Sequence, residues 1–122
     1  MQYLAMIYGE AGRWEALSDD ERAAVYARYT AFSAEAGEAG VLVDGAELAA
    51  TTAATTVRVR DGETFVTDGP FVESKEAIGG YYLFECASLD HAVGWAARIP
   101  GADHGAIEVR PCHVDESEEA VA

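Results

Sequence analysis

Short apolar runs along the chain predict the strands of a sheet. Residues 2–8 form an apolar run bounded by the Gly-containing segment 9–12, a pattern typical of a strand buried on both faces. Residues 81–86 and 106–110 read as two further strands. Because Pro111 has no backbone N–H, we expect little further pairing after the last of these strands.

Strict alternation of apolar and polar residues marks a hairpin in the middle of the chain. Residues 56–60 and 63–67 alternate, and Asp61-Gly62 between them is the favoured two-residue turn. The preceding segment, residues 46–56, is rich in Ala and Thr and gives no clear signal, so we expect an irregular, strand-like connection there. A turn is expected before it at Asp44-Gly45.

Two segments carry helix signals. Ser18 and Glu21 have the spacing of a capping box, and Gly37 or Gly40 is expected to end the helix that they start. Ser88 is expected to cap a second helix, after the strand at 81–86. At helical spacing, the inward-facing positions are Val25, Tyr29, Phe32 and Ala36 in the first helix and Leu89, Ala92, Val93 and Ala96 in the second.

The order of these elements predicts a ferredoxin-like α+β sandwich with an extra β-hairpin, in which two helices cover one face of an antiparallel sheet. A chain of 122 residues most simply forms one domain, which we place at residues 1–113. Residues 114–122 are strongly acidic and are expected to be a disordered tail.

The sheet face without helices needs a cover. In the last strand, Ile107 and Val109 are expected to face the helices, which puts Glu108 and Arg110 on the other face. With aromatic residues from the strand at 81–86, that face is too apolar to leave in water. Pairing of two such sheets in a homodimer solves the problem and leaves a cleft for a small-molecule ligand.

The net charge of the chain narrows the range of possible functions. A net charge of −14 and an isoelectric point near 4.3 argue against nucleic-acid binding and are compatible with a basic protein partner. No apolar run approaches the ~20 residues of a membrane span and no secretory signal is visible, so we expect a cytoplasmic protein without membrane contact.

Cys86 and Cys112 lack metal-ligand spacing and are expected to be reduced, buried hydrophobes. Without phosphate- or dinucleotide-binding motifs, we expect no metal and no cofactor.

The segment from Asp68 to Tyr82 is the most distinctive stretch of the chain. Asp68, Gly69 and Pro70 predict a tight turn, and Gly79-Gly80 predicts a bulge or the close approach of another backbone or a ligand. Charged side chains lie between the two. The segment is either a solvated surface loop or a site carried on a loop.

This segment also carries a family resemblance. Asp68-Gly69-Pro70-Phe71, followed by Glu73, Lys75-Glu76 and Gly79-Gly80-Tyr81-Tyr82, resembles the signature of the DGPF branch of the YCII-related family. Residues 3–8, 88–90, 95–96 and 107–111 extend the resemblance across most of the chain. It implies a dimeric α+β barrel, formed by two ferredoxin-like subunits joined sheet to sheet. It also implies an association with extracytoplasmic-function sigma factors.

The resemblance supplies candidate site residues. The residues that match the family pattern are Asp68, Gly69, Pro70, Phe71, Glu73, Lys75, Gly79, Glu108 and Arg110. Together with Gly80, they form the predicted loop and cleft. We take Asp68 as a candidate acid or base and Arg110 or Lys75 as the group that holds an anion. The alternative is that Asp68 caps its own turn while Glu73 and Lys75 pair across it.

One family feature is missing. The founding YCII branch resembles an enzyme with a His-Asp pair, its His early in the first helix and its Asp just before a Pro in the second. Here the first helix has Tyr26 and Tyr29 but no His, and Ile99 precedes Pro100. That pair cannot be transferred. His104, in a Gly-flanked loop, is the one His kept as a possible proton carrier.

Two functions therefore stand side by side. The first is a small-molecule binder or enzyme of the dimer cleft, using Asp68 and Arg110, for which the family resemblance implies lyase or dehalogenase-like chemistry on ring compounds. The second is a non-catalytic regulatory or interaction module associated with a sigma factor, which the acidic surface would suit.

Overall fold

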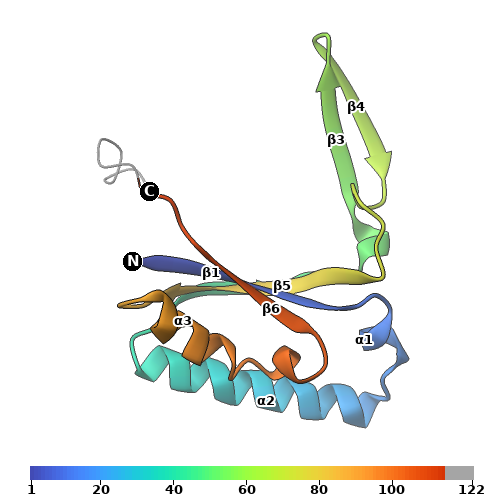
Figure 1. Ribbon diagram of the computed structural model, residues 1–122. Helices are drawn as coiled ribbons and strands as arrows, with labels where there is room; N and C mark the ends of the chain where they lie inside the picture. Colours follow the sequence, from blue (N-terminus) through green and yellow to red (C-terminus); the bar gives the residue numbers. More distant parts are fainter. Residues whose placement is uncertain (115–122) are drawn as a thin grey trace.

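The structure of the protein is a computed structural model, which describes residues 1–114 (Figure 1). Apart from Val114, the predicted acidic tail at 114–122 lies outside the described residues. The body is a four-stranded antiparallel sheet with its helices on one face (Figure 1). A separate two-stranded hairpin stands on the opposite side of the sheet (Figure 1).

The sheet has the strand order β2-β5-β1-β6 that the ferredoxin-like prediction requires. Its strands are β1 (Gln2–Glu10), β2 (Leu42–Glu47), β5 (Glu76–Glu85) and β6 (Ala106–Pro111). All neighbouring pairs are antiparallel. Pairing continues past Pro111, contrary to expectation, because the Cys112 N–H donates to the Gln2 carbonyl at 2.9 Å.

Three α-helices and two 3-10 turns complete the body. They are α1 (Arg13–Ala16), α2 (Asp19–Glu38), α3 (Leu89–Ala96), η1 (Thr51–Ala53) and η2 (Pro100–Asp103). The predicted α+β class is confirmed, with α2 and α3 packed on the same sheet face (Figure 1). In residues 1–114, no helix is long and apolar enough to cross a membrane.

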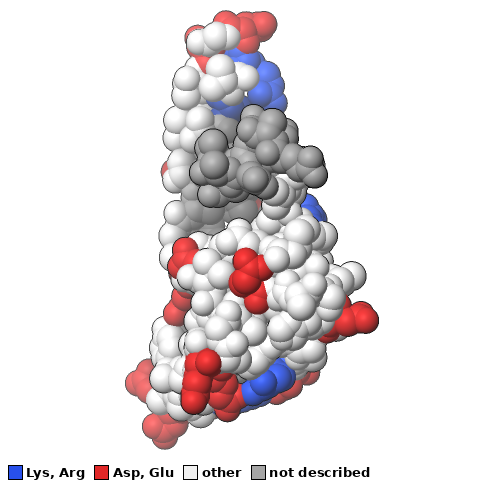
Figure 2. Space-filling view, turned by 90° about the vertical axis from the view of Figure 1, so that its left-hand side faces the viewer, with Lys and Arg blue, Asp and Glu red and all other residues white. Residues whose placement is uncertain are grey.

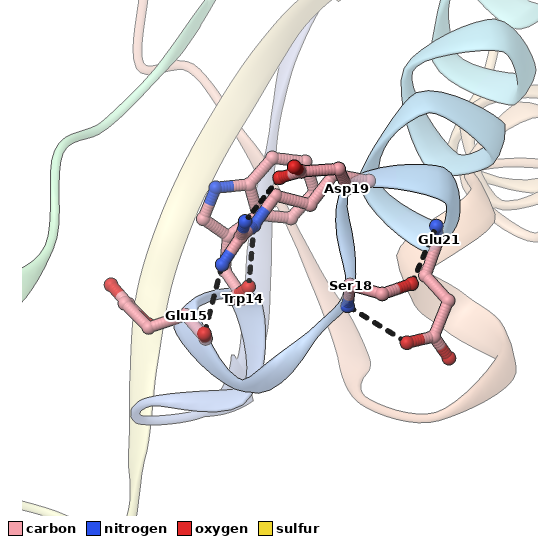
Figure 3. A network of polar contacts seen from close by, with 6 residues as sticks. Trp14, Glu15, Ser18, Asp19 and Glu21 are labelled. Carbon is pink, nitrogen blue, oxygen red and sulfur yellow. Dashed lines mark hydrogen bonds and ion pairs between the residues drawn. The ribbon is translucent and has the colours of Figure 1, made fainter.

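Both ends of α2 form as their residues predict. The Ser18 hydroxyl accepts from the Glu21 N–H and the Glu21 carboxylate accepts from the Ser18 N–H, at 3.1 and 2.8 Å (Figure 3). At the other end Gly40 has φ +75°, and the Val41 N–H donates to the Ala36 carbonyl at 3.0 Å. With the Gly40 N–H bonded to the Gly37 carbonyl, this is a complete Schellman motif, so Gly40 ends the helix.

The core lies between the helices and one face of the sheet. Tyr3 and Ala5 of β1 are buried there, whereas Leu4 and Met6 on the other face are only half-buried. The expectation that this strand is buried on both faces is therefore wrong for a single subunit, because helices cover only one side (Figure 1). Ile107 and Val109 pack on the core as predicted.

Helix α3 is turned differently from the prediction. Leu89 and Val93 are each 49% exposed, while Ala92 and Ala96 are buried. Trp95, which the pattern left out, packs on the core with its ring centroid 6.1 Å from that of Phe32. The two small alanines let the helix approach the sheet closely, and Trp95 fills the volume beside them.

Glycines shape the contact between β2 and β5. Asp44-Gly45 is not a turn: it lies within β2, where the pairing register shifts between Leu42 and Asp44. A Cβ at Gly45 would lie 2.7 Å from the ring of Tyr82, and one at Gly80 would lie 2.8 Å from the Ala46 carbonyl. Gly79 is skipped in the pairing of β1 with β5, so the predicted bulge and close approach are both confirmed.

The predicted hairpin is also confirmed. Strands β3 (Thr55–Arg60) and β4 (Glu63–Asp68) pair in register through Asp61 and Gly62, whose φ values of +53° and +77° give a turn of the I′ kind. We call this hairpin, residues 55–68, the arm. It extends away from the body, and within the arm only Thr56 is not exposed (Figure 1).

Candidate functional site

A cavity of about 1120 Å³ lies between the N-terminal half of α2 and the sheet. We call it the α2 cavity. Its walls come from the end of β1 with α1, from α2, from residues 42–52 after α2, from residues 77–82 of β5, and from residues 100–104 around η2. The cavity opens here because the bulged start of β5 and the glycines at its contact with β2 bring few side chains to this part of the sheet.

Hydroxyl-bearing side chains line this mostly apolar cavity. The Tyr29 hydroxyl accepts from the Gly101 N–H at 3.1 Å, and those of Tyr82 and Ser33 are 3.0 Å apart. Burial raises the pKa of Tyr29 above its ordinary value, so this phenol keeps its proton at neutral pH. Because the Tyr29 oxygen already accepts a hydrogen bond, its proton is left to donate to a ligand.

His104 lies at one side of the α2 cavity, in the loop after η2. Its Cε1 would lie 3.9 Å from a Cβ at Gly9, at the end of β1. Burial, and after it the charge of Arg13, lowers the pKa of His104. A neutral imidazole at pH 7 can accept a proton, and this side chain is the predicted acid-base group that borders the cavity.

The remaining edge of the cavity is fixed by a polar network. The Arg22 guanidinium donates to the carbonyls of Trp14 and Glu15 at 3.1 and 2.8 Å, and so ties α1 to the first turn of α2 (Figure 3). The Trp14 ring meets that of Tyr26 edge-on at 5.0 Å between centroids. The Tyr26 hydroxyl in turn donates to Glu47 at 3.2 Å.

The predicted site residues fall into separate places. Gly79, Gly80 and His104 line the α2 cavity. Gly69, Pro70 and Glu73 line a second, smaller pocket of about 370 Å³. Neither lining includes the remaining predicted residues, which are Asp68, Phe71, Lys75, Glu108 and Arg110.

The Asp68 turn is held by its neighbours. Gly69 has φ +100°, its N–H donates to the Ala54 carbonyl at 2.8 Å, and its carbonyl accepts from the Thr56 hydroxyl at 2.8 Å. Within residues 1–114, the Asp68 carboxylate forms no hydrogen bond or ion pair. The proposed cap of its own turn therefore does not form, and the catalytic role of Asp68 stays a prediction.

The charged residues around this turn are also dispersed. Neither Glu73 nor Lys75 forms an ion pair in the described part of the chain, so the expected pair across the turn is absent. The Phe71 ring lies under the Arg58 guanidinium, 4.8 Å from it, and is exposed. Lys75 contributes its backbone carbonyl, which accepts from Ala11 at 2.9 Å.

Glu108 and Arg110 lie on the uncovered sheet face, as predicted, and pair with each other at 2.5 Å. Arg110 is opposite Leu4, which is opposite Leu83, so it lies about 20 Å along the sheet from the start of β5. Asp68 lies beyond that start, at the foot of the arm (Figure 1). One subunit therefore does not bring Asp68 and Arg110 into one site.

Sequence reasoning missed the polar side of the first helix. It placed Tyr29 in a core stripe and left Tyr26 and Ser33 without a role. All three line the α2 cavity. A signal was present, because hydroxyl-bearing residues at positions 26, 29 and 33 follow one helical face. In residues 1–114, no group of His, Cys, Asp and Glu is placed to hold a metal ion.

Comparison with solved structures identifies a chain of similar fold. It is the 5-chloro-2-hydroxyhydroquinone dehydrochlorinase TftG of Burkholderia phenoliruptrix AC1100, in complex with 2,5-dihydroxybenzoquinone. The TM-score is 0.54 at 15% identity, over 96% of this chain and 98% of that one. At this identity the likeness concerns the fold.

Sequence comparisons give the family. The uncharacterized protein R00369 of Rhizobium meliloti (strain 1021) is 42% identical over 113 residues, which are 91% of each chain. A family model for the YCII-related domain matches residues 1–114. None of these descriptions mentions a sigma factor, so that association and the DGPF branch stay predictions. The chain belongs to the YCII-related domain family.

Proposed function

We propose that this protein binds a small, hydroxylated ring compound in the α2 cavity and performs acid-base chemistry on it. The observation that carries the proposal is the presence of Tyr29 and His104 on the wall of one apolar cavity. Ligand sites typically combine apolar walls with a few polar groups and have volumes of roughly 300–1,000 Å³. A cavity of about 1120 Å³ holds a single-ring compound together with some solvent.

The two polar groups suit complementary tasks. The protonated Tyr29 hydroxyl donates a hydrogen bond to a ring oxygen, and neutral His104 accepts a proton from a ring hydroxyl or carbon. Such proton transfer is the step that lyase or dehalogenase-like chemistry needs first. The solved structure of similar fold holds a ring compound, 2,5-dihydroxybenzoquinone, which makes this the natural first probe.

We also propose that two copies pair through their uncovered sheet faces to form a dimeric α+β barrel. Leu4, Met6, Tyr81 and Leu83 are half-buried in one copy, and pairing would remove them from water. A cleft that uses both Asp68 and Arg110 requires this dimer, since the two residues are far apart within one subunit. The α2 cavity lies beside α2, and its Tyr29 and His104 come from one subunit, although Tyr81 borders it as well.

Calorimetric titration with 2,5-dihydroxybenzoquinone, combined with amide chemical-shift mapping, tests the proposed site. We expect shifts at Gly45, Gly80 and Gly101, which border or line the cavity. Tyr29→Phe removes one hydrogen bond to the ligand and should weaken binding about tenfold, equivalent to ~1.4 kcal/mol. His104→Gln should abolish turnover of any ring compound that is found to react.

Matched variants separate the two candidate sites. Asp68→Asn and Arg110→Gln should leave binding of the quinone unchanged, and His113→Gln controls for the loss of a histidine. Shifts confined to the neighbourhood of Asp68 and Arg110, with no effect of Tyr29→Phe, would move the site to the dimer cleft. Titration without heat or shifts for this quinone and for a panel of hydroxylated single-ring compounds would contradict the proposal.

A further inference from the structure

Within residues 1–114, the arm is exposed along its length, and its contacts with the rest of the subunit are at its foot and at the Phe71 ring under Arg58. Apart from Thr56, every residue of β3 and β4 is exposed. Its hydrogen bonds to residues outside the arm are at its foot, around Gly69 and Ala54. An isolated two-stranded hairpin is at best marginally stable in water, so this geometry calls for another surface against the arm.

Both faces of the arm carry large apolar side chains. Val57 and Val66 are directly opposite each other and share one face with Val59; they are 59%, 65% and 56% exposed. Phe65 lies on the other face, opposite Arg58, and is 48% exposed. The sequence thus places large apolar side chains where, within residues 1–114, the subunit leaves them exposed. Clusters of this kind mark interaction sites.

We propose that the arm of each copy packs against the second copy of this chain in the dimer, and becomes ordered only there. The inference rests on the proposed pairing of the uncovered sheet faces and adds a second contact to it. The arm stands on the uncovered side of the sheet, at the end where β5 begins (Figure 1). A second copy seated on that face lies beside the arm.

The length of the arm fits a second copy. Each strand has six residues, which span about 20 Å. Two sheets packed face to face are about 10 Å apart. An arm that rises from one sheet therefore reaches past the partner's sheet and lies along the edge of the partner, where both of its faces can find contacts.

The charges of the arm and of the body also favour a second copy of this chain as the partner of the arm. Arg58 and Arg60 share one face of the arm, and neither forms an ion pair within residues 1–114. Figure 2 shows basic atoms gathered at the arm below its acidic tip, whereas acidic atoms are scattered over the body below. With a net charge of −14 for the whole chain, the body of a second copy offers carboxylates to these guanidinium groups.

Hydrogen exchange followed by mass spectrometry, together with sedimentation velocity on the full chain, tests this inference. In the dimer, we expect protection of the amides of residues 56–67. In the Leu83→Glu variant, which places a charge in the sheet interface, we expect a monomer whose arm amides exchange near their intrinsic rate while β1 and β5 stay protected.

Variants in the arm sharpen the test. Val57→Ser with Val66→Ser should raise the dimer dissociation constant about tenfold or more, with dimerisation through the sheet face retained at high concentration. Val93→Ser on α3 is a matched control, because Val93 is also exposed but lies on the helix side; it should leave the constant unchanged. Arg58→Gln should weaken the dimer at low salt and have little effect at high salt.

The outcomes separate this inference from the dimer itself. A dimer that Leu83→Glu disrupts, but whose arm exchanges freely and whose constant is insensitive to the valine changes, would overturn the arm contact and leave the sheet pairing intact. A parent chain that is monomeric at all concentrations would overturn both. Ligand binding in the α2 cavity is measured separately and does not depend on either result.

Discussion

The body and the arm of this protein use the same kinds of residues in opposite ways. Phe84 in β5 is 0% exposed and stacks on Tyr82, with 5.8 Å between ring centroids. Phe65 in β4 is 48% exposed and lies opposite Arg58 of β3. Phe84 belongs to the apolar run at residues 81–84, whereas Phe65 lies in a strand whose apolar and polar residues alternate. The difference teaches that alternation predicts a strand but does not say what covers it.

The largest expected difference in unfolding free energy between body and arm comes from removing one aromatic side chain from each. Phe84→Ala empties the centre of the core and should lower the free energy of unfolding by about 3–5 kcal/mol. Phe65→Ala removes a ring that no core surrounds, and we expect less than ~0.5 kcal/mol for the monomer. Urea denaturation, performed on the Leu83→Glu background to remove any dimer contribution, gives both values. Similar losses for the two variants would mean that the arm packs on its own body.

Two glycines with nearly the same positive φ allow a finer comparison. Gly40 ends α2 with φ +75° and Gly62 turns the arm with φ +77°, and a Cβ at either would meet nothing within 4 Å. Gly40→Ala should therefore destabilise the body by about 1–2 kcal/mol through backbone strain alone. Gly62→Ala carries the same strain but should leave urea unfolding of the monomeric body unchanged. If Gly62→Ala lowered the free energy of unfolding as much as Gly40→Ala, the arm and the body would unfold together.

The capping box tests whether the body depends on local bonds as well as on packing. Ser18→Ala removes the side chain that accepts from the Glu21 N–H and should cost about 1 kcal/mol. Glu21→Gln keeps a side-chain acceptor for the Ser18 N–H and should cost less (Figure 3). Thermal unfolding measures both, and equal effects of the two changes would argue against a reciprocal box.

The smallest expected effect is the pH dependence of stability that His104 contributes. Because the pKa of His104 is lowered from 6.5, the folded state takes up this proton less readily than the unfolded state. The contribution of His104 to stability should therefore fall as pH decreases from about 6.5 through its lower folded pKa, and should be constant at higher pH. His104→Gln removes this decline, whereas His113→Gln should keep it. Parallel stability curves for the parent chain and His104→Gln would contradict the assignment.

Local signals in the sequence predicted the fold well. The Asp61-Gly62 turn, the Ser18 capping box and the bulge at Gly79 are each decided by residues close together in the chain. The inward face of β6 follows equally simply, because Ile107 and Val109 alternate with charged residues. The four errors, at α3, at Asp44-Gly45, on the second face of β1 and after Pro111, concern how an element packs or pairs with its neighbours.

The site was predicted less well, since it depends on distances between segments. The DGPF segment predicted a special loop, but whether Asp68 and Arg110 share a site depends on the path of β5 between them. The α2 cavity was invisible in the sequence because its walls come from five separate stretches of the chain. Tyr29 fitted an apolar stripe equally well as a core residue or as a cavity residue.

The sequence by itself determined the helices, the hairpin turn, the order of the elements and the residues on each face of β6, because caps, turns and alternation act over a few residues. Only the tertiary structure decided that the arm leaves the body, that a cavity opens beside α2, and that His104 reaches it while Asp68 does not. The physical reason is that burial and distance are properties of surfaces brought together from far along the chain, and glycines at positions 45, 79 and 80 control how closely those surfaces meet.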